Sequence, residues 1–268
     1  MTTQQCLVLR LAGPLQSWGT HSQLYRRSTA SQPTKGAIVG LLAAAQGRRR
    51  TDPIEDLLQL EIGVRTDQAG SLLRDYHTVS TVDGKPLPQA AVTSKGIQKP
   101  TSPHMYTKIT KRYYLQDALF VAAISGDPEL LHGLHGALRT PAFPLALGRR
   151  CCPPTQPLVL PSIHNNPGRL WDGSPLQVLS GVPWQVPIWR LSSATLHPAP
   201  QHGVVQLQVT VDDQQGNDTA VDLPLSFHPK QRQFTSRPVT HHWVLITVDV
   251  DATAATPDRH DPMYLLEG

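Results

Sequence analysis

The side chains best suited to chemistry in this chain are cations, and they gather in three places. Between Gly84 and Gln116 the sequence has no Asp or Glu, whereas it carries six cations: Lys85, Lys95, Lys99, Lys108, Lys111 and Arg112. Shorter clusters lie at Arg48–Arg50 and at Arg149–Arg150, the latter directly after Gly148. An acid-free run of this length is typical of a surface that meets phosphate groups. For Arg48–Arg50 alone, a solvated face or a helix end is the better interpretation.

Binding a single-stranded nucleic acid needs groups that hold phosphates, planar groups that stack on bases and polar groups that contact base edges. The chain has candidates for each role. The phosphate candidates are Arg26, Arg27, Lys35, Arg149 and Arg150, together with Lys108, Lys111 and Arg112 from the basic run and a backbone contact at Gly148. The candidates for stacking on bases are Trp18, Tyr25, Tyr76 and His77. The polar candidates are Gln16 and Ser17. For Trp18, a place in the hydrophobic core is an equally good interpretation.

A catalytic interpretation uses some of the same residues. Metal-independent cleavage of RNA beside a 2′-hydroxyl needs a general base, a general acid and a cation near the developing negative charge. Tyr76, His77 and Lys85 are the candidate set, but such a trio arises easily by chance in a chain with 12 histidines. We therefore expect a protein without catalytic activity and keep an endoribonuclease as the alternative.

Metal and cofactor chemistry has little support in the sequence. The cysteines are Cys6, Cys151 and Cys152, with no second pair at the spacing of zinc ligands. His241 and His242 lie near His228, but neighbouring side chains on a strand point to opposite faces. A histidine in 162–166 lacks the second histidine of a ββα-metal nuclease. We expect no metal site, no cofactor and, from the few cysteines, a reducing compartment.

Composition predicts a soluble globular protein. The 268 residues are 39% hydrophobic and 16% charged, and the net charge of +4 neither requires nor excludes nucleic acid. No apolar run approaches the roughly 18 residues of a membrane span. Met1–Cys6 lacks the features of a secretory signal. We therefore expect a cytoplasmic protein that makes no contact with membranes.

The clearest predicted helix runs from Lys35 to about Gln46. Thr34 is a suitable N-cap, and Gly47 is placed to end the helix. Gly36 leaves one side of the first turn bare, and glycine in a helix costs about 1 kcal/mol relative to alanine. Close packing against a sheet is the main explanation for this glycine, and a phosphate at the free N–H groups of the first turn is a second one.

The predicted strands and helices follow a ferredoxin-like order. Apolar alternation or apolar runs predict strands at 6–11, 60–65, 118–124 and 156–160. With the helix after Thr34 and a second one beginning at Asp127, the order is β-α-β-β-α-β. The third strand lacks the aromatic residues on which RNA-recognition motifs stack bases, so loops and helix ends would have to bind RNA. The insertion at 66–116 holds the basic run.

The composition of the sequence changes after residue 160. Residues 161–203 are rich in Pro, Gly, Asn and His, and strands are predicted at 205–211, 220–223 and 243–250. We therefore expect a domain at 1–160, a smaller β-rich unit at 161–250 that packs on it, and a polar tail at 251–268.

Four motifs in a fixed order add a family resemblance. They are Leu9–Gly19 (LRLAGPLQSWG), a segment beginning at Pro33 (PTKG), Arg74–Val79 (RDYHTV) and Leu147–Leu158 (LGRRCCPPTQPL). The ordered set resembles the CasD family of type I-E CRISPR Cascade subunits, within the RAMP superfamily of CRISPR RNA-binding proteins. The resemblance covers residues 5 to 160 and matches 162–202 poorly.

The resemblance implies an α+β, RRM-like RAMP domain in which 66–116 is a thumb. It also implies a non-catalytic subunit that grips the 5′ handle of the CRISPR RNA, aided by a glycine-rich loop at Gly148. The implied partners are the backbone and large subunits and, through the guide duplex, target DNA in antiviral defence. Ile97 and Met105 are a candidate wedge at a displaced base pair. Relatives in type I-C systems process RNA themselves, which keeps the ribonuclease alternative open, and a subunit that mainly bridges proteins is a third hypothesis.

Overall fold

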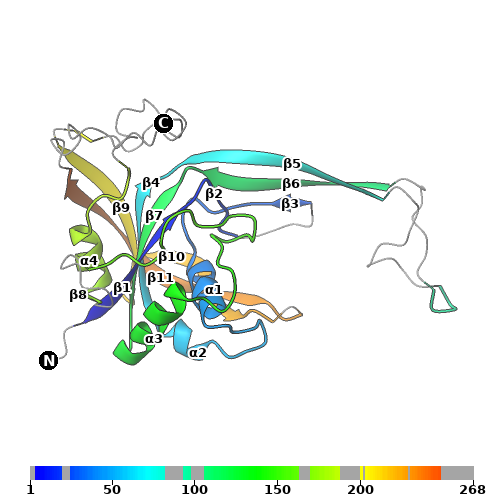
Figure 1. The fold of residues 1–268 in the computed structure, drawn as a ribbon, viewed down its shortest axis with the longest axis horizontal. Helices are drawn as coiled ribbons and strands as arrows, with labels where there is room; N and C mark the ends of the chain where they lie inside the picture. Colours follow the sequence, from blue (N-terminus) through cyan, green and yellow to red (C-terminus); the bar gives the residue numbers. More distant parts are fainter. Residues whose placement is uncertain are drawn as a thin grey trace, which may run out of the picture.

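A seven-stranded sheet organises the fold of the computed structural model (Figure 1). The structure describes residues 4–19, 25–81, 93–97, 106–162, 170–187, 200–201, 203–228 and 230–248. The strand order in the sheet is β10-β11-β9-β4-β7-β1-β8. The strands are β1 (Gln5–Ala12), β4 (Glu61–Gln68), β7 (Leu119–Ser125), β8 (Trp171–Asp172), β9 (Val204–Asp212), β10 (Asp218–Ser226) and β11 (Gln233–Thr247).

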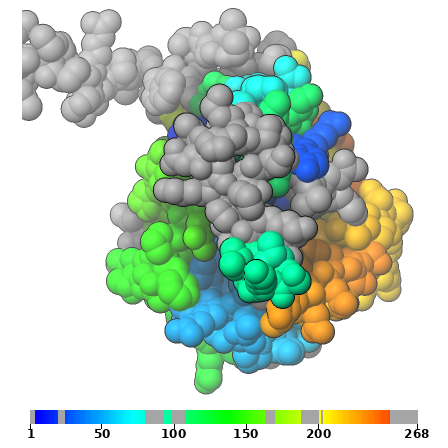
Figure 2. Space-filling model, turned by 90° about the vertical axis from the view of Figure 1, so that its right-hand side faces the viewer, coloured from blue at the N-terminus to red at the C-terminus, as the bar shows by residue number. Residues whose placement is uncertain are grey.

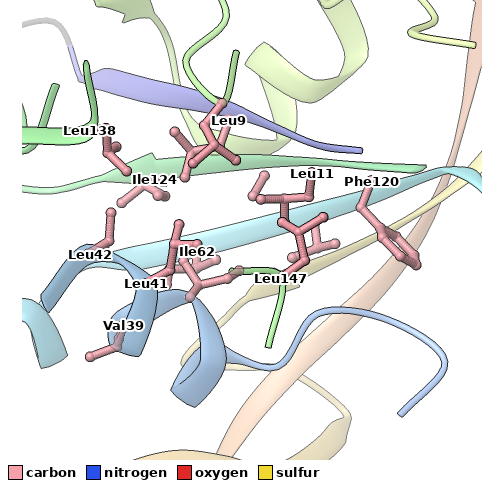
Figure 3. Close-up of a cluster of buried hydrophobic side chains, with 14 of the residues drawn as sticks. Leu9, Leu11, Val39, Leu41, Leu42, Ile62, Phe120, Ile124, Leu138 and Leu147 are labelled. Atoms are coloured by element: carbon pink, nitrogen blue, oxygen red, sulfur yellow. The ribbon is translucent and has the colours of Figure 1, made fainter. Parts of the chain in front are cut away.

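Helices cover both faces of this sheet. On one face lie α1 (Lys35–Ala45), α2 (Glu55–Leu58) and α3 (Pro128–Arg139), and on the other lies α4 (Pro175–Gly181). Leu9 and Leu11 pack with the first group, as Figure 3 shows, whereas Val8 packs with α4. The predicted strand at 6–11 is confirmed. It is buried on both faces, because a helix covers each side of the sheet.

Most of the predicted β-α-β-β-α-β order is present. Strands β4, β7 and β1 are antiparallel neighbours. Along the chain, α1 lies between β1 and β4, and α3 follows β7, as expected. The predicted strand at 156–160 is reduced to a single bridge between Val159 and Leu9. Pro157 and Pro161 stand on either side of this bridge. Since proline removes a backbone donor, these two residues limit the extension of the strand. The fold is therefore mixed α and β, and the last strand of the predicted order is incomplete.

The β-rich region predicted at 161–250 contributes strands to the central sheet. Strand β9 pairs with β4, where Gly63 lies opposite Val211, and β8 pairs with β1. Residues beyond 160 thus extend the central sheet at both edges. The physical reason is that β4 and β1 would otherwise present open edges with unpaired backbone groups. The predicted tail at 251–268 lies outside the described residues.

A buried ion pair fastens α4 to the sheet. Arg65 on β4 is fully buried, and its Nε lies 2.6 Å from Oδ1 of Asp67. The same guanidinium donates to the backbone carbonyls of Leu179 and Val182, at the end of α4. Because a buried charge is tolerated only when it is paired and hydrogen-bonded, these contacts define where α4 sits.

A long two-stranded arm projects from the central sheet (Figure 1). It consists of β5 (Ser71–Thr81) and β6 (Tyr106–Gln116), with the short strands β2 (Leu15–Gln16) and β3 (Arg26–Arg27) along the other side of β6. Figure 2 looks toward the end of the arm, where residues 93–97 face the viewer. The position of the arm, between β4 and β7, is that of the predicted insertion. Among the described residues, none of the helices has the length and apolar composition needed to cross a membrane.

Candidate nucleic-acid interface

The arm presents two chemically different faces. Strands β5 and β6 pair without a shift in register, from Ser71 opposite Gln116 to Thr81 opposite Tyr106. Successive side chains of a strand point to opposite faces, and directly opposed residues share a face. One face, here called the tyrosine face, therefore comprises Arg26, Arg74, Tyr76, Lys111 and Tyr113. The other, here called the mixed face, comprises Arg27, Asp75, His77, Lys108 and Arg112.

The tyrosine face combines cations and rings without a carboxylate. The guanidinium of Arg26 lies 5.2 Å from the ring centroid of Tyr113, within the range of a cation–π contact. Tyr76 is 59% exposed and lies opposite Lys111. Stacking rings alternating with cations are the chemistry with which proteins hold single-stranded nucleic acid.

The mixed face carries an acid among its cations. Asp75 lies opposite Arg112, and its carboxylate is 3.8 Å from Nδ1 of His77. Near β3, the ammonium of Lys108 lies 5.5 Å from the ring centroid of Tyr25. The carboxylate of Asp75 offsets one of the positive charges of this face.

The candidate catalytic set does not converge. Tyr76 and His77 are neighbours on β5, so their side chains point to opposite faces of the arm. The third member, Lys85, lies outside the described residues. The strand geometry therefore removes the arrangement that the ribonuclease alternative requires of Tyr76 and His77.

Gln16 and Trp18 belong to the interior, which corrects the expectation that they contact RNA. The side-chain amide of Gln16 donates to the carbonyls of Leu11 and Ala118 at 3.0 and 2.7 Å and accepts from Nε1 of Trp18 at 3.2 Å. Trp18 is 1% exposed and packs edge-on against Phe120. The core interpretation of Trp18 is thus the right one.

Gly148 brings the first and fourth motifs together. Its φ is +89°, and a Cβ at this position would lie 1.8 Å from the carbonyl oxygen of Ser17. Ser17 is buried, its N–H donates to Leu147, and its hydroxyl donates to the carbonyl of Tyr113. Only glycine permits this approach of two backbones. Gly148 and Ser17 therefore shape the loop at 147–152, and the Ser17 side chain is not presented to RNA.

The two arginines of this loop have different surroundings. Arg150 is exposed. Arg149 is half-buried, and its guanidinium donates to backbone carbonyls of β6 and of the β3 segment. The sequence alone treats these neighbours as equal phosphate candidates, and the structure separates them.

Lys35 is also a structural residue, which corrects its assignment to phosphate. It is 7% exposed, and its Nζ lies 2.7 Å from the carboxylate of Asp212 and 2.7 Å from the carbonyl of Leu60. Its backbone N–H donates to Asp222, so a carboxylate already occupies the beginning of α1. A Cβ on Gly36 would lie 2.9 Å from the carbonyl oxygen of Asp222, which confirms close packing as the reason for this glycine.

Within the described residues, the remaining candidates form no second site. The described residues contain no group of three or more His, Cys, Asp or Glu side chains placed to hold a metal ion. Burial raises the pKa of Cys6 and of Cys152 to about 12, so both thiols are unreactive at neutral pH. Ile97 is 64% exposed, whereas Met105 lies outside the described residues, so the wedge hypothesis remains a prediction.

Sequence reasoning missed two members of the tyrosine face, Arg74 and Tyr113. Both follow from the period of two along β5 and β6 once the two strands are paired in register. The signal that would have found them is a cation and a ring two residues apart on each strand, Arg74 with Tyr76 and Lys111 with Tyr113. This spacing gains its meaning only when the two strands are paired.

Comparisons with known proteins agree with these motifs. A family model described as "CRISPR-associated protein (Cas_Cas5)" matches residues 6–240. A protein of Escherichia coli (strain K12), described as "CRISPR system Cascade subunit CasD", is 34% identical over 168 residues, which cover 58% of this chain and 69% of that protein.

Two solved structures are similar to the whole fold. A chain of a "CRISPR RNA-guided surveillance complex" is 30% identical, with a TM-score of 0.69 over 91% of this chain and 92% of that one. A "Crystal structure of Cas protein" is 30% identical, with a TM-score of 0.62 over 91% of this chain and 99% of that one. The similarity extends well beyond residue 160, into the strands that complete the sheet.

Proposed function

Because this chain belongs to the CRISPR-associated protein family Cas_Cas5, we propose that it is the subunit of a Cascade-type surveillance complex that grips the 5′ handle of the guide RNA. In this role it has no catalytic activity and works in the cytoplasm in antiviral defence. It contacts the neighbouring backbone and large subunits, and it meets target DNA only through the guide duplex.

The tyrosine face of the arm is the observation that carries this proposal. Its cations, Arg26, Arg74 and Lys111, lie beside two rings and no carboxylate. Single-stranded RNA is bound by stacking bases on aromatic rings and by pairing phosphates with cations. Arg150, exposed on the loop at the base of the arm, is a further phosphate contact in this proposal.

Exposed apolar side chains support contacts with other subunits. On β11, Trp243 is 64% exposed and Leu245 is 69% exposed, and both point to the same side of the strand. On the arm, Leu72 and Val79 are 65% and 56% exposed. Trp243 and Leu245 are grouped on one surface, as side chains at sites of protein association are, whereas Leu72 and Val79 lie on opposite faces of β5.

The first test is recovery of the complex with its RNA. The tagged chain is expressed with its neighbouring operon and repeat array, purified, and the bound RNA is sequenced. We expect a multisubunit particle that holds guides with a uniform 5′ end. A particle that assembles without RNA would support the bridging hypothesis instead.

The second test compares the two faces at equal change in charge. We expect the triple variant Arg26→Ala, Arg74→Ala, Lys111→Ala to lose handle RNA, because it removes the cations of the tyrosine face. The matched control is Arg27→Ala, Lys108→Ala, Arg112→Ala on the mixed face, which should lose less. Each lost phosphate contact lowers the slope of log K against log salt by about 0.7 for single strands, so the first variant should lower it by about 2. Equal losses in both variants would mean that net charge, and not this face, determines binding.

The ribonuclease alternative has a direct test. The isolated full chain is incubated with repeat RNA in EDTA, and the products are separated by size. We expect intact RNA, because Tyr76 and His77 lie on opposite faces. Cleavage would overturn the non-catalytic role and make Tyr76→Phe and His77→Ala the next variants to assay.

A further inference from the structure

We propose that Arg149 is a positioning residue that holds the β3 segment, with the cations Arg26 and Arg27, against β6. It is not itself a phosphate contact. This inference rests on the proposed function, because Arg26, one of the two cations that Arg149 positions, belongs to the tyrosine face assigned to RNA.

The guanidinium of Arg149 is directed at backbone carbonyls. Nη1 donates to Tyr113 on β6 at 3.3 Å, and Nη2 donates to Arg27 at 2.8 Å and to Ser28 at 3.4 Å. The central carbon lies 4.8 Å from the ring centroid of Tyr114. An arginine side chain has hydrogen-bond donors and no acceptor, and here both of its terminal nitrogens donate to the protein. The side chain therefore links two strands, with one end on each.

The β3 segment needs such a link. In the part of the chain that the structure describes, strand β3 consists of Arg26 and Arg27 and pairs with β6. The segment is also attached at Tyr25, whose carbonyl accepts from Lys111 at 2.8 Å, and at Ala30, whose N–H donates to the carbonyl of Trp18 at 2.6 Å. The Thr29 hydroxyl accepts from the N–H of Trp18 at 2.9 Å. So short a ladder orients its side chains weakly. The hydrogen bonds from Arg149 reach the carbonyls of Arg27 and Ser28, between the attachments at Tyr25 and Ala30, and so hold the part of the segment that carries the cations.

The position of Arg149 is itself set by a tight turn. The N–H of Leu147 donates to the carbonyl of Cys152 at 2.7 Å, and the N–H of Cys152 donates to the carbonyl of Arg149 at 2.9 Å. Gly148 seats this turn against Ser17, whose hydroxyl donates to the same Tyr113 carbonyl that Arg149 uses. The first and fourth motifs thus act together to aim one guanidinium at the β3 segment.

Lysine at this position separates positioning from direct contact. Arg149→Lys keeps the positive charge, which is enough for a phosphate, but an ammonium is a compact point charge. It cannot reach the carbonyls of both strands while lying over the ring of Tyr114. A direct phosphate contact would therefore survive this substitution, and a positioning role would not. Arg150→Ala is the matched control, because it removes an exposed cation from the same loop.

The first measurement is amide hydrogen exchange in the full chain without RNA. In Arg149→Lys and Arg149→Ala, we expect faster exchange at Lys111 and Ala30, the two amides that hold the β3 segment, and no change in Arg150→Ala. Unchanged exchange in both Arg149 variants would overturn the proposal. Arg149→Lys also provides a soluble comparison if Arg149→Ala fails to fold.

The second measurement is the affinity for handle RNA in a double-mutant cycle. Arg149→Lys should weaken RNA binding about tenfold, because it removes a charge-assisted hydrogen bond that keeps the β3 segment ordered. In a chain that already carries Arg26→Ala and Arg27→Ala, the same substitution should change nothing further. Additive losses, or wild-type affinity in Arg149→Lys, would refute the positioning role. If the wild-type chain fails to bind handle RNA, the proposed function fails, whereas the exchange experiment still decides whether Arg149 holds β3.

Discussion

Several polar and aromatic side chains of the motifs serve the interior and not the surface. Gln16 satisfies two backbone carbonyls and the indole of Trp18, and Lys35 pairs with Asp212. A buried polar group must be hydrogen-bonded, and the partners of Gln16 and Lys35 satisfy this requirement inside the fold. At the scale of single residues, the first motif is therefore mainly a structural motif that supports the RNA candidates.

Replacing Trp18 tests this distinction. Trp18→Ala removes a fully buried ring and should lower the free energy of unfolding by about 3–5 kcal/mol. The control Trp243→Ala, at a position that is 64% exposed, should change it by less than about 0.5 kcal/mol. Urea denaturation measures both values.

A milder variant addresses RNA binding directly. Trp18→Phe keeps an aromatic ring in the core and should bind handle RNA as the wild-type chain does, because the ring is not at the surface. A loss of RNA at unchanged stability would contradict the placement of Trp18 in the core.

At the scale of elements, a network of ion pairs joins α1 to the hairpin of β10 and β11. Arg237 on β11 bonds to the carboxylates of both Asp212 and Asp222. Asp222 accepts the N–H of Lys35 at the beginning of α1, and Asp212 accepts the Lys35 ammonium. Four charges thus neutralise one another beneath the hairpin, which places β10 against the helix.

Breaking this network should be costly. Arg237→Ala removes the guanidinium that Asp212 and Asp222 share, leaves Asp222 without a side-chain cation and should lower the free energy of unfolding by about 3–5 kcal/mol. The control is Arg48→Ala, which removes the more exposed pair with Asp56 and should cost at most about 1 kcal/mol. Thermal unfolding followed by circular dichroism compares the two. Equal small effects would mean that solvent screens the network as it screens the surface pair.

At the scale of the whole molecule, the central sheet joins the two halves of the chain. Val8 and Val121 lie under α4, in one cluster with Val209 of β9. Since each half covers the apolar side chains of the other, neither half has a complete core. The family match over residues 6–240 covers the same continuous sheet.

A shortened chain tests this unity. A chain that ends at residue 160 lacks α4, β8 and β9 and exposes the face that carries Val8 and Val121. We expect it to lose the cooperative thermal transition and to bind a dye for exposed apolar surface, as partly folded states do. A sharp transition in the shortened chain would support the two-unit interpretation of the sequence.

Local signals predicted the elements whose causes are local. The helix at Lys35–Ala45 was predicted with its N-cap Thr34, because a cap depends on residues within one turn. The helix after Asp127 was predicted for the same reason, and its Asp127 side chain accepts from the N–H of Leu130. The strand at 156–160 was over-predicted, since its apolar pattern is real but prolines at its ends restrict the pairing.

The sequence by itself determined the family, the order of the main elements and the basic character of the insertion, because these reside in short motifs and in composition. Only the tertiary structure decided which residues of the motifs face outward. The partners of Trp18, Lys35 and Arg149 are Phe120, Asp212 and Arg27, each about a hundred residues or more away along the chain. Burial and pairing at such separations depend on how strands meet in the sheet, and no local pattern encodes that meeting.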